Sequence, residues 1–270
     1  MAELANIVAE LRSSGLRWHT LQAVGREWRH HALLNEAFIA ATLPPPAGAR
    51  AGVHFQGGGT IVRTASEPAP EVGEEIWRWW SQEPDRLKVE FAVGNETVTA
   101  WFQGSTWWSW SPSQGARTNE GRENVGHGKG PGEALVSPAR AARVLDFELL
   151  GELSFLGRPA YRLRARPFTR GDFDLHKLGS GADEYELVVD AERGFLLRAE
   201  ARLGAKPFRA LEMTEMVVDA ELPAGIFTPE APEGERFEYF EHHRRLTLEE
   251  LPGSVPFKVF VPAKAPGRLG

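Results

Sequence analysis

Apolar and polar residues alternate one by one along the stretch from Ile76 to Trp110, IWRWWSQEPDRLKVEFAVGNETVTAWFQGSTWWSW. Leu87 and Val89, for example, are separated by a charged residue. Period-two alternation with β-branched and aromatic residues predicts half-buried antiparallel strands. Gly94-Asn95 and Gln103-Gly104-Ser105 fall between the apolar runs, where hairpins need compact residues or positive φ. The stretch therefore predicts a meander of three or four strands with one apolar face.

The same stretch is unusually rich in tryptophan. For any single tryptophan, a place in the core or in a hairpin is the simplest interpretation, because an indole buries a large area. Seven indoles within 35 residues are harder to fit into one close-packed core. The stretch therefore predicts a concave apolar surface that receives a ligand. Seven of the nine tryptophans of the chain lie here: Trp77, Trp79, Trp80, Trp101, Trp107, Trp108 and Trp110.

The alternation returns between Tyr161 and Val217, where arginine and glutamate separate the apolar positions. The segments Asp190–Gly194 and Gly204–Pro207 have the length and composition of hairpin loops. One charged face and one dry face are typical of an antiparallel sheet that is exposed to water on one side.

Helical patterns are fewer than strand patterns. The segment Leu4–Leu11 has apolar residues at helical spacing, and residues 30–42 have a helical composition. Ser137 and Pro138 suit the N-cap and first turn of a helix over Pro138–Leu150. Thr247–Glu250 is a capping box that predicts one more short helix.

These patterns predict a mainly β (α+β) fold with about ten or eleven strands and three or four helices. So few helices cannot cover such a sheet from outside. We therefore expect a large curled antiparallel sheet that forms an incomplete barrel, with the helices plugging or lidding its concave face. No linker precedes Glu230. We expect an incomplete barrel with its lid over residues 1–229, and over residues 230–270 an appendage, a short helix plus an extended segment, packed on it.

The composition narrows the function classes. The 270 residues are 42% apolar, enough for a sizeable core. The net charge is −6 and charges of both signs are interleaved, which argues against a nucleic-acid partner. The chain has no cysteine, so it has no disulfide, thiolate metal site or cysteine nucleophile.

Membrane and export signals are absent from the sequence as it stands. No apolar run is long enough to span a bilayer. The first fifteen residues lack the basic and apolar regions of a secretory signal, and no cysteine is present to carry a lipid. Taken alone, the sequence therefore predicts a cytoplasmic protein.

No segment predicts catalysis. Residues 121–129 have the glycine spacing of a nucleotide loop but lack its lysine and hydroxyl, so we expect a mobile surface loop over residues 111–132. Asp172, Asp174 and His176 lack the further ligands of a calcium or zinc site. No Gly-x-Ser-x-Gly motif occurs. We expect no enzyme, no metal and no cofactor.

Three motifs in a fixed order resemble the bacterial lipoprotein-carrier family, the LolA-like half-barrel proteins. They are PDRLKVEF at Pro84–Phe91, GSTWWSWSP at Gly104–Pro112 and the hairpin YELVVDAERGFLLR at Tyr185–Arg198. The resemblance spans about Leu4 to Phe227. It implies an incomplete β-barrel with a helical lid over an apolar cavity, which agrees with the fold expected from the alternation. It also implies non-catalytic binding of acyl chains or other hydrophobic ligands outside the cytoplasmic membrane, and therefore a removed export signal.

The leading hypothesis is accordingly a carrier or sensor that binds a lipid or acyl chain, possibly that of a lipoprotein, in an aromatic-lined concavity. The alternative is a regulatory or scaffolding module that binds a protein partner through the same half-barrel, as relatives that sense envelope stress do. Both faces of Trp77–Trp80 are aromatic, so the sequence leaves its inward face open. The expected lining residues are the apolar-face members of the strands: Trp77, Trp79, Leu87, Val89, Phe91, Phe102, Trp108, Trp110, Leu163, Tyr185, Leu187, Leu197 and Met213.

Overall fold

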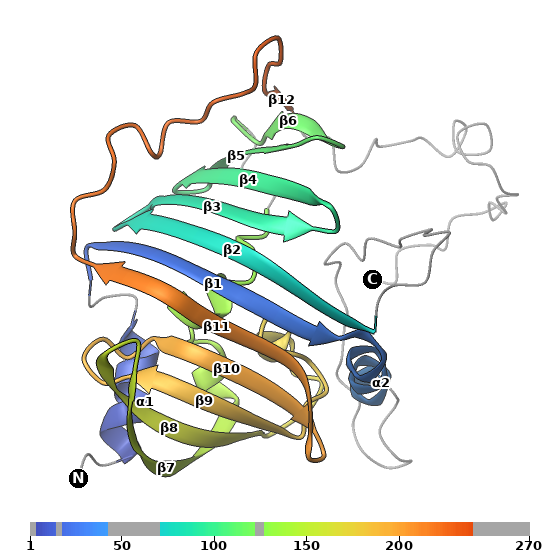
Figure 1. The fold of residues 1–270 in the computed structure, drawn as a ribbon, viewed down its shortest axis with the longest axis vertical. Coiled ribbons are helices and arrows are strands. Elements are labelled where there is room, and N and C mark those ends of the chain that lie inside the picture. The colour runs from blue at the N-terminus through green and yellow to red at the C-terminus, as the bar shows by residue number, and fades with distance from the viewer. Residues whose placement is uncertain (1–3, 15–17, 43–70, 122–126, 240–270) are drawn as a thin grey trace, which may run out of the picture.

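A single twelve-stranded sheet dominates the computed structural model, which describes residues 4–14, 18–42, 71–121 and 127–239 (Figure 1). The strand order is β12-β6-β5-β4-β3-β2-β1-β11-β10-β9-β8-β7, and among these described strands only the β12–β6 pair is parallel. The sheet does not close, so the predicted incomplete barrel is confirmed. The strands are β1 (Thr20–His30), β2 (Val72–Gln82), β3 (Arg86–Val93), β4 (Glu96–Gln103), β5 (Thr106–Ser111), β6 (Gly115–Thr118), β7 (Leu145–Phe155), β8 (Arg158–Pro167), β9 (Glu184–Asp190), β10 (Leu196–Leu203), β11 (Lys206–Val218) and β12 (Glu238–Tyr239).

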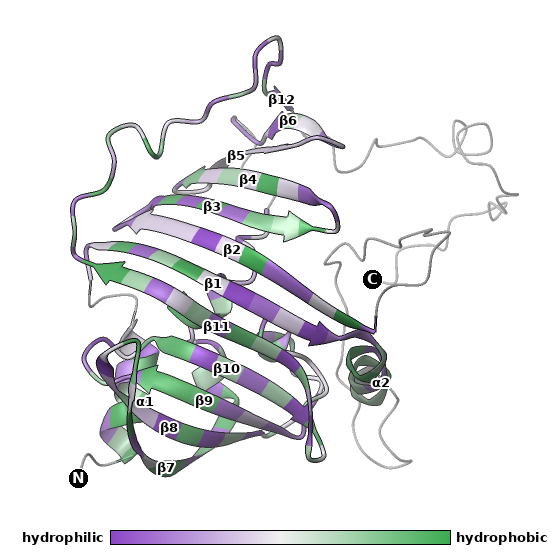
Figure 2. Cartoon of the chain, in the orientation of Figure 1, coloured by the Kyte–Doolittle hydropathy of each residue, from purple (hydrophilic) through white to green (hydrophobic). Residues whose placement is uncertain are grey.

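Two meanders share this sheet. Strands β2 to β6 form one and β7 to β11 form the other, and the β1–β11 pair joins them across the middle (Figure 1). The predicted tryptophan meander is therefore the first unit, and the arginine- and glutamate-rich strands are the second. Figure 2 shows the alternation of apolar and polar residues along the strands of both units.

Register sorts the side chains onto two faces. Directly paired residues lie on the same face of a sheet. Trp79 pairs with Val89, and Val89 pairs with Ala100. All three are buried and belong to the main hydrophobic cluster. Their face is called the inner face below, and the opposite face is called the outer face.

Helices are short and few in the described part of the chain. Helix α1 (Leu4–Ser13) buries Ile7 and Leu11 and contacts β7, as its amphipathic spacing predicts. Helix α2 (His31–Thr42) follows β1 directly and contacts β1 and β11. A single helical turn, α3 (Glu133–Val136), contacts β10. No described helix is long and apolar enough to cross a membrane.

The predicted helix over Pro138–Leu150 is wrong. The 3-10 turn Ala141–Arg143 is its only helical part, and the strand β7 begins at Leu145. The register between β7 and β8 shifts between Leu149 and Gly151, which marks a β-bulge. The extra residue of a bulge interrupts period-two alternation. The apolar residues that precede the bulge therefore have a spacing that resembles one face of a helix.

The C-terminal part of the described chain forms a strap. Residues 219–239 leave β11 and pass along one end of the first meander to reach β6 (Figure 1). There Glu238 and Tyr239 pair with Arg117 and Thr118. The predicted helix at Thr247–Glu250 and the extended segment beyond it lie outside the described residues.

Candidate ligand-binding face

Aromatic side chains of the first meander converge on the inner face. Trp77 and Trp79 on β2 are 1% and 4% exposed. Phe91 on β3 pairs with Trp77, and Phe102 on β4 pairs with Trp107 on β5. The indole of Trp79 donates a hydrogen bond to Ser81 Oγ at 2.8 Å. Four neighbouring strands thus present one continuous aromatic surface.

A glycine-rich segment of the same chain covers this surface. Residues 127–132, His-Gly-Lys-Gly-Pro-Gly, are called the glycine arm below. The His127 ring lies 4.8 Å from the Trp107 ring and 5.8 Å from the Phe102 ring, measured between centroids. A Cβ atom at Gly130 would lie 2.7 Å from Phe91 Cδ1. The Lys129 ammonium lies over the Phe102 ring, 5.8 Å from its centroid. The aromatic surface therefore faces glycine backbone, one imidazole and one ammonium along the arm.

The surface loop predicted over residues 111–132 is wrong in two places. Residues 115–118 form strand β6, and the arm lies inside the concavity. Residues 122–126 lie outside the described part of the chain. Nothing in the sequence predicts this position, because glycine-rich segments are ordinarily surface loops. The role that the predicted helix would have had as a plug is filled by the arm and α3.

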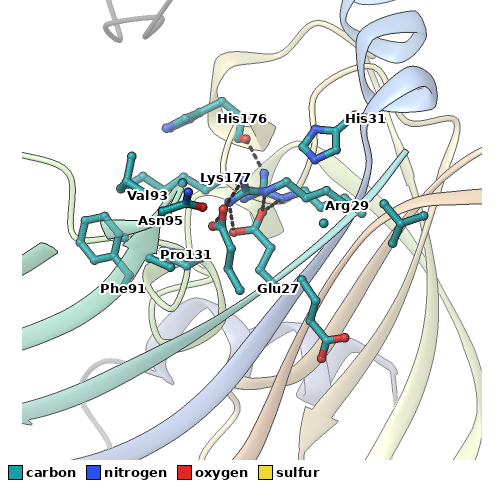
Figure 3. A pocket seen from close by; sticks show the side chains of 17 residues that line it. Glu27, Arg29, His31, Phe91, Val93, Asn95, Pro131, His176 and Lys177 are labelled. Atoms are coloured by element: carbon teal, nitrogen blue, oxygen red, sulfur yellow. Dashed lines mark hydrogen bonds and ion pairs between the residues drawn. The ribbon is translucent and has the colours of Figure 1, made fainter. Parts of the chain in front are cut away.

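A cavity of about 730 Å³ lies beside the arm, within the size range of small-molecule sites. Phe91, Val93 and Pro131 lie on one side of it, and Arg29 and His31 lie on the other (Figure 3). Because Gly130 and Pro131 belong to both the arm and the cavity wall, the cavity and the covered aromatic surface adjoin.

A buried ion-pair cluster forms the polar side of the cavity. Glu27 on β1 is 1% exposed and accepts two hydrogen bonds of 2.6 Å from Arg29, in a bidentate pair. Arg209 on β11 donates to Glu27 at 2.7 Å and to the His176 carbonyl at 3.1 Å. Arg29 also donates to Glu75 at 2.9 Å. The cluster therefore ties β1, β2 and β11 to the turn at His176.

The cluster changes the protonation of its members. Burial alone would raise the pKa of Glu27, but Arg209 and Arg29 outweigh it, so this pKa lies below its usual value. The hydrogen bond from Arg29 to Glu27 raises the pKa of that guanidinium. Burial lowers the pKa of His176 and of His127, so both rings favour the neutral form at neutral pH.

Trp108 and Trp110 do not lie where we expected them. Trp107, not Trp108, shares the inner face with Phe102, because these two residues are directly paired. Trp108 pairs with Trp101, which in turn pairs with Lys88 on the outer face. Trp110 donates to Glu235 of the strap at 3.1 Å. The error has a simple origin, since Trp107 and Trp108 are adjacent and both parities of β5 carry indoles.

The other predicted lining residues fall into two groups, all on the inner face. Those of the second meander are 0–1% exposed, belong to the main hydrophobic cluster and do not line the cavity. Of the first group, Phe91 lines the 730 Å³ cavity, Trp77 and Trp79 lie against Gly132, and Phe102 lies against His127. Leu87 and Val89 belong to the hydrophobic cluster. The first group is Trp77, Trp79, Leu87, Val89, Phe91 and Phe102, and the second is Leu163, Tyr185, Leu187, Leu197 and Met213.

The acidic segment at Asp172 has a structural role. Asp172 Oδ1 accepts a hydrogen bond from the Asp174 amide at 2.9 Å and caps the 3-10 turn η3 (Phe173–Leu175). His176 stacks on Phe173 with ring centroids 4.7 Å apart. Among the described residues, no group of three or more acidic, histidine or cysteine side chains is arranged to hold a metal ion.

Comparison with known proteins finds similarity in structure alone. No protein-family profile and no curated protein matches the sequence. MucB matches with a TM-score of 0.49 at 13% identity, over 84% of this chain and 62% of the MucB chain, so this chain spans less than two thirds of that protein. LppX, a lipoprotein of Mycobacterium tuberculosis, matches with a TM-score of 0.42 at 10% identity, over 82% of this chain and 99% of LppX.

A LolA superfamily protein from Nitrosomonas europaea also matches, with a TM-score of 0.30 at 12% identity, over 85% of this chain and 99% of that protein. The proteins to which this chain is structurally similar thus include a member of the LolA superfamily, the family that the sequence motifs resemble. Function has to be argued from the residues of this chain.

Proposed function

We propose that the protein binds a hydrophobic ligand, a lipid or an acyl chain, against the inner aromatic face without catalysing a reaction. It would act as a carrier or as a sensor. The observation that carries the proposal is the glycine arm. Trp77, Trp79 and Phe91 are covered by a segment with glycine at the points of contact, next to a cavity of about 730 Å³.

The energetics favour exchange of the arm for a ligand. Glycine has no side chain to bury, so the arm contributes little apolar surface of its own for the conformational freedom it loses. Each buried methylene of a ligand contributes about 0.8 kcal/mol, so roughly fourteen methylenes supply about 11 kcal/mol before the costs of association. An acyl chain that enters beside Phe91 and displaces the arm would therefore bind without a charged anchor.

Fluorescence quenching tests this proposal with matched variants. A brominated acyl ester should quench a large share of the tryptophan emission, and Phe91→Asp should weaken this quenching by placing a carboxylate on the dry face. Ile76→Asp is the control, because Ile76 is exposed on the outer face of β2. The proposal fails if the ester does not quench, or if both variants quench as the unaltered protein does.

One observation favours a protein partner as the second candidate. The concavity already receives a polypeptide segment, since the arm lies on Trp77 and Trp79. An extended glycine-rich segment of a regulatory partner would fit the same surface. Extraction of the purified protein with organic solvent separates the candidates, because mass spectrometry should detect released lipid only if the first is correct.

A further inference from the structure

The cationic side chains around the 730 Å³ cavity already have carboxylate partners within the chain. Arg29 pairs with Glu27 at 2.6 Å and with Glu75 at 2.9 Å. Arg209 pairs with Glu27 at 2.7 Å. Lys177 pairs with Glu133. Within the described residues, each of the three cations of the cavity wall therefore has its counter-charge in place.

A charged ligand head would disturb this balance. A carboxylate or phosphate placed beside Arg29 would meet Glu75, whose side chain is only 22% exposed. It would have to break the Arg29–Glu75 pair or remain without a counter-charge where solvation is poor. A cationic head would meet Arg29 and Lys177 in the same way. An uncharged polar head disturbs neither pair, and it can exchange hydrogen bonds with Asn95 and His31, which also line the cavity.

The two sides of the cavity suggest how such a ligand lies. Phe91, Val93 and Pro131 form the apolar side, next to the aromatic surface under the arm. Arg29, Glu75 and His31 form the polar side. A chain that starts at Phe91 can continue toward Trp79 once the arm has left, while its head stays among the polar side chains.

We infer that the ligand is a neutral amphiphile, an acyl chain with an uncharged alcohol, glyceride or ester head held beside the Arg29–Glu75 pair. This inference rests on the proposed function, because it describes the ligand of the same site. It excludes free fatty acids and anionic phospholipids as preferred ligands. It also assigns Glu75 a role in specificity: this carboxylate occupies Arg29 Nη1, the guanidinium nitrogen outside the bidentate pair with Glu27, which would otherwise bind an anionic head.

The test compares two brominated probes with the same chain, one a monoacylglycerol and one a carboxylate, on the unaltered protein and on Glu75→Gln. We expect the monoacylglycerol to bind the unaltered protein about tenfold more tightly, from the cost of a charge-assisted contact left unmade. Glu75→Gln leaves Arg29 paired with Glu27 but removes the charged partner of its Nη1. The substitution should therefore strengthen binding of the carboxylate probe about tenfold and leave binding of the monoacylglycerol unchanged.

Glu74→Gln is the matched control. Glu74, the neighbouring residue on β2, also lines the cavity, but its carboxylate pairs with Arg26 on the outer face, at 3.5 Å. Glu74→Gln should leave the affinity for both probes unchanged. Glu133→Gln, which frees Lys177, gives a second and independent route to stronger binding of the carboxylate probe if Glu75→Gln does not fold.

The outcomes separate this inference from the proposed function. If neither probe quenches the tryptophan emission, the hydrophobic-ligand function itself is wrong and the inference falls with it. If the monoacylglycerol binds but the carboxylate binds the unaltered protein as tightly, only the inference about the head is overturned. The inference is also overturned if Glu75→Gln and Glu74→Gln affect the carboxylate probe equally.

Discussion

A Cβ atom at Gly132 would lie 2.9 Å from Cε3 of Trp77, closer than side-chain carbons pack in proteins. The glycine arm can lie on the inner face only because it has no side chain at this point. We predict that Gly132→Ala weakens the packing of the arm and destabilises the ligand-free protein by about 1–3 kcal/mol, the usual cost of overpacking. Denaturant unfolding measures this change.

The same substitution should strengthen ligand binding, because the ligand then competes with a weaker arm. Gly128→Ala is the control, since no atom lies within 4 Å of a Cβ placed there. Equal effects of the two substitutions on stability and on affinity would mean that the contact between the arm and Trp77 does not control access to the inner face.

The orientation of strand β5 gives a second prediction. Trp107 contacts the arm through His127 and lies on the inner face, whereas Trp108 lies on the outer face. We predict that Trp107→Phe lowers the fraction of tryptophan emission that a brominated ester quenches, and that Trp108→Phe does not lower it. A larger loss with Trp108→Phe would show that the ligand lies on the outer face.

The buried carboxylate Glu27 gives a prediction about pH. Its pKa is lower in the folded protein than its ordinary value of 4.5, because Arg209 and Arg29 outweigh the effect of burial. A lowered folded pKa contributes stability that is present above the unfolded pKa and is lost as the pH falls through the folded pKa. The protein should therefore lose stability from about pH 4.5 downward.

The substitution Glu27→Gln should remove this part of the pH dependence. It leaves two guanidinium groups without their shared carboxylate, so we expect a loss of about 3–5 kcal/mol at neutral pH. Glu74→Gln, at an exposed pair, should cost much less. Thermal unfolding between pH 3 and pH 7 measures both effects. If Glu27→Gln loses stability below pH 4.5 as steeply as the unaltered protein does, the assigned role of this carboxylate is wrong.

The strap gives a fourth prediction. Glu235 accepts hydrogen bonds of 3.1 Å from the Trp110 indole and from the Ala116 amide, and Phe237 packs edge-on against Trp101. We predict that Glu235→Ala loosens this end of the strap and speeds tryptic cleavage at Arg236 about fivefold, as expected from lost hydrogen bonds.

Glu233→Ala is the control for the strap, because Glu233 is an exposed neighbour on the same segment. If the two substitutions change the rate of cleavage equally, Glu235 does not hold the strap against the sheet.

The alternation of single residues was enough to predict the sheet and most of its faces. The helix predicted for residues 138–150 was wrong because of the bulge in β7, where one inserted residue interrupts the period-two alternation of apolar and polar positions. The assignment of Trp108 to the inner face was wrong because Trp107 and Trp108 are adjacent tryptophans, and two neighbouring indoles do not indicate which face of β5 points inward.

The site was less predictable than the sheet, because its main features depend on long-range contacts. Glu27 and Arg209 are 182 residues apart in sequence and meet only across the β1–β11 pair. In the sequence, the one indication of this cluster is Glu27 itself, a charged residue at a position of β1 that faces inward. The glycine arm gave no signal at all, since nothing in a glycine-rich segment specifies the surface it covers.

Hydrogen exchange tests the central claim, that a hydrophobic ligand replaces the glycine arm on the inner face. The amides of Ala134, Leu135 and Val136 donate to carbonyl groups of Pro131 and Gly132 in the arm. Saturation with a neutral acyl ester should therefore speed exchange at residues 134–136 and slow it in β2 and β3. Exchange at residues 134–136 that stays unchanged or slows, while the ester is bound, would contradict the account.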